Sequence, residues 1–308
     1  MKKTELYGNL LVLFTTVVYG VNTPVMKTVM PEWIDGWALS TVRQVFAAVA
    51  FWITSFFIPA QKIQKKHLLY MIGGGFFGLA MNQIPYALGL TLGSPVDSSI
   101  LRSSTPVVVI ILALLIYKQK VTARLIFSVL LGIAGAVLII ALGGNVPGGH
   151  PHLDGNLLVM LSILSYSFYL VLIKPVAGQY HVVHIMKWMF LSAAVITLPF
   201  SYTHIAAAKA FGASTDWSVI VRILYSCVFA TYIAYMVNVE ALKYITPTRE
   251  SLYSYLQPVV ATAVAIVLGQ DKLTWIDPVA LLLIFASFYL LTFRKRAQTP
   301  AGKSGRVT

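Results

Sequence analysis

Polar side chains recur at helical spacing within long apolar runs of this sequence. Asn82 and Tyr86 lie four residues apart, and so do Tyr253 and Gln257. Residues at this spacing share one face of a helix. A longer stripe of the same kind occurs in the second half of the chain and consists of Ser162, Ser165, Tyr166 and Tyr169. Hydroxyl, amide and phenol groups on helix faces can bind a polar small molecule through hydrogen bonds.

A polar group buried in apolar surroundings is costly unless it is paired. Each of these side chains could be satisfied singly, by a hydrogen bond to a neighbouring helix. Their grouping on helix faces in both halves of the chain favours one shared polar cavity instead. We expect the substrate-binding residues to be Tyr19, Asn82, Tyr86, Arg102, Ser165, Tyr166, Tyr169, Tyr235, Asn238, Tyr253 and Gln257.

Catalysis would require other residues, such as a nucleophile beside a base or a pair of carboxylates. No histidine lies at the centre of an apolar run, and Cys227, the only cysteine, has no histidine near it in sequence. His150, His152 and Asp154 form a weak metal-binding pattern with too few fixed ligands. We therefore expect no catalytic residue, no cofactor and no metal site, and an intramembrane enzyme stays a remote alternative.

The composition identifies the elements that must position these groups. Hydrophobic residues make up 58% of the chain and charged residues 11%, whereas soluble domains are about 25% charged. The run from Val107 to Ile116 is apolar at every position, unlike the alternating strands of a membrane barrel. We predict an all-α polytopic membrane protein with about ten spans, at residues 7–26, 36–59, 68–91, 98–117, 124–142, 155–173, 184–205, 217–242, 248–268 and 275–293.

The basic residues predict the orientation, because cytoplasmic loops carry an excess of Lys and Arg. With the N-terminus inside, 15 of them lie on the inner side and three, Lys27, Lys209 and Lys272, on the outer side. We predict a multi-pass protein of the cell (inner) membrane with both termini cytoplasmic. The net charge of +13 is then mainly a topology signal. The expected partners are the lipid bilayer and a small-molecule substrate, with no nucleic acid, and the chain is expected to be a monomer or a weak dimer.

The sequence contains an internal repeat. The pentapeptide GNLLV begins at Gly8 and occurs again 147 positions later. Alignment of the two copies places Tyr19 on Tyr166 and Lys27 on Lys174. The match therefore extends over a whole predicted helix.

The repeat continues in the fourth span of each half. Pro95 pairs with Pro247 and Pro106 with Pro258, each 152 positions apart. We place the two halves at 1–146 and 147–296, followed by a cytoplasmic tail at 297–308. Five spans is an odd number, so the second half must enter the membrane from the opposite face. Secondary transporters use such inverted repeats to open a central site alternately to each side, whereas a sensor or receptor has no evident need of them.

The segments around these prolines resemble the EamA-type members of the drug/metabolite transporter superfamily. They read ALGLTLGSPVDSSILRSSTPVVV from Ala87 and ALKYITPTRESLYSYLQPVVA from Ala241. The resemblance covers nearly the whole chain. It implies ten helices in two five-helix halves, a central cavity, and export of amino acids or other small metabolites. One departure is that the Gly-Glu pair common in the family after the P-V-V helix reads KQK from Lys118 and GQDK from Gly269.

Pro106 and Pro258 lie inside predicted spans, where each removes an N–H and frees the carbonyl four residues earlier, at Arg102 and Ser254. Matched helix interruptions in two halves point to the binding site of a transporter. A kink whose free groups are satisfied by neighbours would give the same pattern. Arg102 faces the carbonyl gap of Pro106 and is our candidate for binding a substrate carboxylate.

All ten acidic residues fall in predicted loops or within about a turn of a predicted helix end. Asp97 and Glu250 begin helices, where a carboxylate can cap N–H groups or favour the helix dipole. Proton-driven carriers usually keep an ionisable group deep in the bilayer. We therefore predict a facilitator or exchanger that exports small metabolites, amino acids first among them, by alternating access. Drugs and nucleoside- or nucleotide-type metabolites are the alternative substrates, and proton coupling is the alternative energy source.

Overall fold

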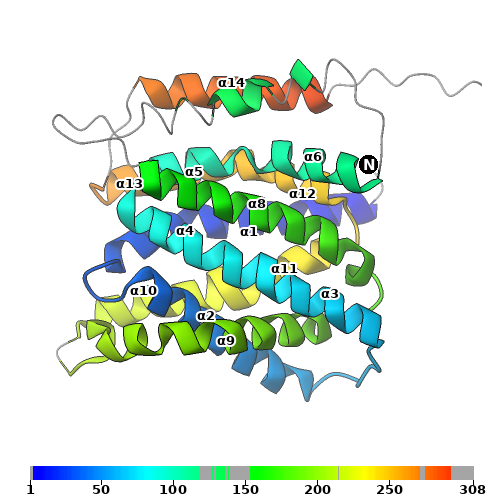
Figure 1. The fold of residues 1–308 in the computed structure, drawn as a ribbon, viewed down its shortest axis with the longest axis vertical. Coiled ribbons are helices and arrows are strands. Elements are labelled where there is room, and N and C mark those ends of the chain that lie inside the picture. Colours follow the sequence, from blue (N-terminus) through cyan, green and yellow to red (C-terminus); the bar gives the residue numbers. More distant parts are fainter. Residues whose placement is uncertain are drawn as a thin grey trace, which may run out of the picture.

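The computed structural model describes residues 3–117, 126–127, 130–135, 138, 153–213, 215–270 and 275–292. These residues form α-helices with short π- and 3-10-helical segments, and no strand occurs among them. The helices lie side by side across the molecule, with α14 (Ile276–Thr292) at one end and α2 (Gly36–Ser55) and α9 (Val182–Ala207) at the other (Figure 1). The predicted all-α fold is confirmed.

Within the described residues, six helical stretches are long and apolar enough to cross a membrane: Thr4–Val29, Gly36–Ser55, Pro95–Leu112, Leu153–Ala177, Val182–Ala207 and Trp217–Ala241. Two further apolar helices, Gln257–Val267 and Pro278–Ser287, are shorter. The chain is therefore polytopic, while the count of ten spans stays a prediction. Most of the predicted span at 124–142, the boundary after residue 146 and the tail at 297–308 lie outside the described residues.

The two halves contain matching helices in the same order, from α1 to α6 and from α8 to α13. The first half consists of α1 (Lys3–Val29), α2, α3 (Lys65–Gly75), a π-helix (Phe76–Ala80), α4 (Met81–Leu92), α5 (Pro95–Arg102) and α6 (Thr105–Tyr117). The second consists of α8 (Leu153–Ala177), α9, α10 (Trp217–Cys227), a π-helix (Val228–Ile233), α11 (Ala234–Ala241), α12 (Pro247–Leu252), a 3-10 turn (Tyr253–Leu256), α13 (Gln257–Val267) and α14. A short 3-10 helix, Lys209–Phe211, follows α9. The π-helices start 152 positions apart, at the same point of each half.

The fourth helix of each half is broken at the place that its proline predicts. The sequence placed Pro106 and Pro258 inside predicted spans, as interruptions of each helix. Instead each proline lies in the first turn of a new helix, α6 or α13, where its missing N–H has no partner to lose. The carbonyl of Arg102 is not left free, because the Thr105 hydroxyl donates to it. The carbonyl freed at this break therefore has a hydrogen bond from a neighbouring side chain, as expected for the alternative of a simple kink.

The matched lysines bind matched helix ends. Lys27, near the end of α1, donates to the carbonyl oxygens of Leu90 and Gly93 at 2.8 and 2.7 Å. Lys174, near the end of α8, donates to the carbonyl oxygens of Leu242 and Ile245 at the end of α11. These two residues lie 152 positions after Leu90 and Gly93. A cation at a helix C-terminus satisfies carbonyls that have no partner within the helix. The sequence repeat is thus also a repeat of tertiary contacts.

The glycines of the two GNLLV segments explain why the pentapeptide is repeated. A Cβ on Gly155, at the start of α8, would lie 2.9 Å from the carbonyl oxygen of Gly89 in α4. A Cβ on Gly8, at the start of α1, would lie 2.9 Å from Cβ of Tyr244, just after α11. Each helix start therefore needs glycine to approach the third helix of the opposite half.

Together these contacts show that the halves are inverted. The end of α4 contacts the end of α1, through Lys27, and the start of α8, through Gly155. Helices α1 and α8 must therefore run in opposite directions. The same holds for α2 and α9, where Thr41 donates to Ser201 at 2.7 Å and Thr197 donates to Gln44 at 2.8 Å, so that residue numbers rise along one helix and fall along the other.

Candidate functional site

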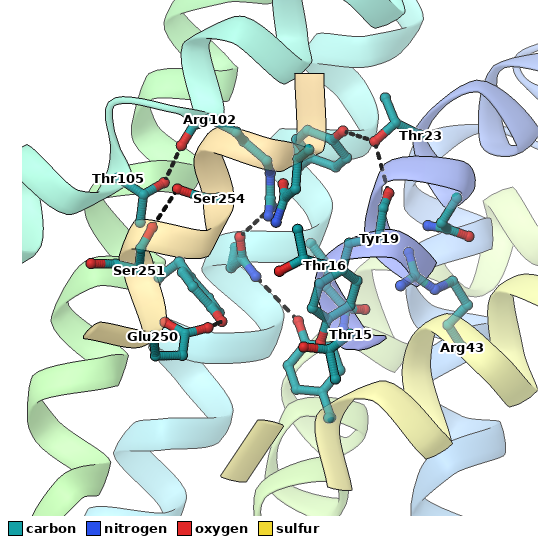
Figure 2. A pocket seen from close by; sticks show the side chains of 17 residues that line it. Thr15, Thr16, Tyr19, Thr23, Arg43, Arg102, Thr105, Glu250, Ser251 and Ser254 are labelled. Atoms are coloured by element: carbon teal, nitrogen blue, oxygen red, sulfur yellow. Dashed lines mark hydrogen bonds between the residues drawn. The ribbon is translucent and has the colours of Figure 1, made fainter. Parts of the chain in front are cut away.

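A polar cavity lies at the meeting of the two halves, and residues of both halves line it (Figure 2). Its volume is ≈ 50 Å³, which holds only a few water molecules. A metabolite therefore needs the surrounding helices to move apart. The lining residues are Thr15, Thr16, Tyr19, Asn22, Thr23, Arg43, Asn82, Gln83, Tyr86, Arg102, Thr105, Tyr166, Tyr235, Glu250, Ser251, Ser254 and Gln257.

Arg102 enters the cavity from the end of α5. Its Nη2 donates to Asn82 Oδ1 at 3.1 Å, and its guanidinium carbon lies 4.1 Å from the centre of the Tyr86 ring. An arginine over an aromatic face gains a cation–π interaction. Its Nε is buried and has no hydrogen-bond partner among the described residues. The guanidinium is thus held in place while part of its hydrogen-bonding capacity stays available.

Asn82 joins several helices around Arg102. Its Nδ2 donates to the Gly78 carbonyl at 3.0 Å and to the Tyr235 hydroxyl at 3.2 Å. Its Oδ1 accepts from Ser162 at 2.9 Å as well as from Arg102. The amide therefore connects α4, α5, α8 and α11, and fixes the orientation of the guanidinium.

Glu250 lies deeper in the protein than the sequence predicts. It lies in the first turn of α12, as expected, but the side chain that caps this helix is Thr246, which accepts from the Arg249 N–H at 3.2 Å. Glu250 itself is 6% exposed and lines the cavity. Its Oε1 accepts from the Tyr166 hydroxyl at 3.1 Å and from Asn238 Nδ2 at 2.7 Å, while Oε2 is buried and has no partner in the part of the chain that the structure describes. A position near a helix end does not place this carboxylate at the surface.

Asp97 is likewise not the cap of its helix. That role belongs to Ser94, whose hydroxyl accepts from the Asp97 N–H at 3.0 Å. Asp97 is buried but does not line the cavity. The two acids at the starts of α5 and α12 therefore have different environments.

The structure brings most of the predicted site residues together. Seven of the eleven line the cavity: Tyr19, Asn82, Tyr86, Arg102, Tyr166, Tyr235 and Gln257. Tyr19 and Tyr235 pack edge to face with ring centroids 6.0 Å apart. The Tyr19 hydroxyl is buried and has no hydrogen-bond partner within the described ranges. Unsatisfied groups of this kind are available to a ligand.

The other four predicted residues lie outside the cavity lining. Ser165 donates to the Phe77 carbonyl at 2.7 Å and so joins α8 to the π-helix. Tyr169 is fully buried in the hydrophobic core, and Tyr253 is half-buried beside another apolar cluster. Asn238 binds Glu250 and positions it without lining the cavity.

Several lining residues were not in the predicted set. On α1 these are Thr15, Thr16, Asn22 and Thr23. Thr15, Asn22 and Thr23 follow helical spacing with Tyr19. Under the repeat, Thr15 and Asn22 match two members of the α8 stripe, so the stripe rule applied to α1 would have found them. Arg43 and Glu250 carried no such signal. Among the described residues there is no group of three His, Cys, Asp or Glu that could hold a metal ion.

Comparison with known proteins gives a family match in both halves. The model of the EamA-like transporter family matches residues 6–141 and 153–293. The chain is 22% identical over 281 residues to an uncharacterized transporter, YetK, of Bacillus subtilis, covering 88% of this chain and 83% of that one. It is 24% identical over 303 residues to a "Probable amino-acid metabolite efflux pump" of Salmonella typhimurium, covering 96% of this chain and 98% of that one.

A solved crystal structure has the same fold. It superposes with a TM-score of 0.65 at 15% sequence identity and covers 93% of this chain and 98% of that one. At this identity the likeness shows the fold alone.

Proposed function

The chain belongs to the EamA-like transporter family, and from this premise we propose that it exports small zwitterionic metabolites of the amino-acid type. The relative from Salmonella typhimurium, named as an amino-acid metabolite efflux pump, supports both the substrate class and the direction. Drugs and nucleoside-type metabolites remain the alternative substrates.

The observation that carries this proposal is the pair of opposite charges in the cavity. Arg102 and Glu250 both line it, and the Tyr166 side chain lies between them. The ring centre of Tyr166 is 5.9 Å from the Arg102 guanidinium, and its hydroxyl donates to Glu250. An α-amino acid carries one carboxylate and one ammonium group at neutral pH. Buried charges need partners of opposite sign, and this site offers one partner for each.

We propose alternating access between the two inverted halves as the mechanism. The matched helix breaks at α5–α6 and α12–α13 and the matched π-helices support it, because such irregular segments gather at functional sites in membrane transporters. The boundary between halves at residue 146 remains part of this proposal, as does a monomer or weak dimer.

For energy coupling we retain a facilitator or exchanger, and one observation favours proton exchange as the second candidate. The sequence predicts no proton coupling because it places no carboxylate deep in the protein. Glu250 is buried in the cavity, so that premise is wrong. An ionisable group at such a site can take part in proton transfer.

The test is counterflow with the purified protein in liposomes. Vesicles loaded with unlabelled amino acids should accumulate the labelled amino acid and return it chemically unmodified, first at equal pH and then with an imposed pH gradient. Modification of the substrate would show an enzyme. Absence of exchange for every amino acid would contradict the proposed substrate class, and uphill accumulation driven by the pH gradient would establish proton coupling.

The proposed orientation has a separate test. Cys227, the only native cysteine, is 2% exposed. We therefore expect thiol labelling to report the introduced cysteines, with little reaction at Cys227. Gly212→Cys should react with an impermeant thiol reagent on intact cells, and Gln64→Cys should react only after the membrane is opened. The reverse labelling would overturn cytoplasmic termini.

A further inference from the structure

We propose that Arg43 binds a second carboxylate on the transported amino acid, so that the site selects acidic amino acids over neutral ones of the same shape. This inference rests on the proposed function and specifies its substrate class. It is based on Arg43, a buried cation that has no role in the proposed pairing of Arg102 with a carboxylate and Glu250 with an ammonium group.

Arg43 is a charge inside the membrane-spanning part of the protein. It lies on α2, is 4% exposed and lines the cavity. A charged side chain at such a position is costly and is normally paired or faces a functional cavity. The ion pairs found among the described residues are His204 with Asp35, Lys243 with Glu240 and Arg249 with Glu5. None of them involves Arg43, so its charge is not balanced by a carboxylate in the described part of the chain.

The partners of Arg43 are all neutral. Its Nε donates to the Thr231 hydroxyl at 2.7 Å, and its Nη1 donates to the sulfur of Met26 at 3.4 Å. Thr231 in turn donates to the Ser226 carbonyl at 2.7 Å. These bonds fix the guanidinium between α1, α2 and the second π-helix without cancelling its charge.

Donor groups remain on this guanidinium. Arginine carries five N–H donors in a planar fork that matches a carboxylate. With the described residues Arg43 makes two hydrogen bonds, through Nε and Nη1, which leaves Nη2 for a ligand. Carboxylates bound by arginine commonly take two parallel hydrogen bonds.

The charges around the cavity favour a ligand of one net negative charge. Figure 2 shows Glu250 and Arg43 on opposite sides, with Thr15, Thr16 and Tyr19 between them, and Arg102 entering from a third direction. The charged lining residues are thus two cations and one anion. A ligand with two carboxylates and one ammonium would pair each of them, whereas a neutral amino acid would leave one arginine unpaired in a medium where that is expensive.

The experiment compares three ligands of similar shape. Glutamate, glutamine and glutarate are tested as competitors of labelled glutamate in counterflow by the full-length protein in liposomes. We expect glutamate to compete at roughly a tenfold lower concentration than glutamine, the scale of one charge-assisted hydrogen bond. Glutarate, which lacks the ammonium group, should compete less well than glutamate.

Variants then locate the preference. Arg43→Gln should bring the glutamate-to-glutamine ratio close to one, and Arg43→Lys should keep part of it because the charge is retained. Arg222→Gln, on α10 and outside the cavity lining, is the matched control and should keep the wild-type ratio. The readout is a ratio, so a uniform loss of folded protein does not change it.

A wild-type protein that exchanges glutamine as well as glutamate would overturn this inference while leaving the proposed function intact. An unchanged ratio in folded Arg43→Gln would overturn it as well. If Arg43→Gln does not fold, the wild-type ratio and the Arg43→Lys variant still decide. Failure of all amino acids to exchange would overturn the proposed function itself.

Discussion

In the first half of the chain, α5 ends at Arg102, whose guanidinium reaches the central cavity. The matching residue in the second half, 152 positions later, is Ser254, whose hydroxyl donates to the Ser251 carbonyl at 2.6 Å. One turn earlier, the charged residue belongs to the second half instead. There the second half places Glu250 in the cavity, and the first half has the neutral, fully buried Ser98. The fourth helix of each half therefore supplies one charge, of opposite sign and at a different register.

The residues that shape the backbone are matched far more closely. Ser94 and Thr246 both cap the fourth helix of their half, and Lys27 and Lys174 bind the same carbonyl positions at the end of the third. Both halves must form the same helix ends, so both keep the residues that satisfy them. A ligand with one carboxylate and one ammonium has no two-fold symmetry, so a site between two inverted halves must differ in its charges.

The largest effect is expected from removing the charge that only the first half provides. Arg102→Ala should weaken binding of a carboxylate-bearing substrate by about 2 kcal/mol, or roughly 30-fold, because a charge-assisted hydrogen bond is lost. The matched Ser254→Ala should change affinity by about threefold at most, since it removes only a neutral hydrogen bond. Half-saturating concentrations in counterflow measure both. Equal effects at the two positions would contradict a special role for the charge of Arg102.

The charge that only the second half provides is tested by Glu250→Gln. We expect amino acids to bind about 1.5 kcal/mol more weakly, roughly tenfold, because the ammonium partner becomes neutral. The glutamine carbonyl can still accept from Tyr166 and Asn238, so the fold is retained. Ser98→Ala is the matched control in the first half. If a pH gradient drives uphill transport, that drive should disappear in Glu250→Gln, and its persistence would place the proton site elsewhere.

The matched lysines should behave alike. Lys27→Met and Lys174→Met are each expected to lower the free energy of unfolding in detergent by about 1 to 1.5 kcal/mol, because helix-end carbonyls lose a charged donor. Lys243→Met is the control, since Lys243 makes a partly exposed pair with Glu240 three residues earlier, and solvent-accessible pairs contribute about 1 kcal/mol or less. Thermal or denaturant unfolding followed by circular dichroism measures the change. A clear difference between Lys27 and Lys174 would argue against equivalent roles.

The smallest effect is expected from the paired helix caps. Ser94→Ala and Thr246→Ala should each cost about 0.5 to 1 kcal/mol of stability, because one N–H of the first turn loses its acceptor. The same unfolding assay applies, and the transport selectivity should not change. A shift in selectivity without a loss of stability would mean that these hydroxyls act on the substrate.

The sequence by itself determined the membrane class, the helical fold and the inverted repeat. Apolar run length depends only on composition along the chain, and the matched prolines and lysines are visible at fixed spacing. It also found seven of the seventeen residues that line the cavity, because helical periodicity shows which side chains share a face. Tyr86, Tyr166 and Gln257 were found in this way.

Only the tertiary structure decided which faces meet at the cavity. Ser165 and Tyr169 lie on a predicted polar stripe, yet one joins α8 to a π-helix and the other lies in the core. Glu250 was judged shallow from its distance along its own helix, but Tyr166 of α8 and Asn238 of α11 cover it. Arg43 stands in the cavity because α1 and the second π-helix pack against α2 there. Depth and exposure depend on neighbours distant in sequence, and periodicity within one helix carries no information about them.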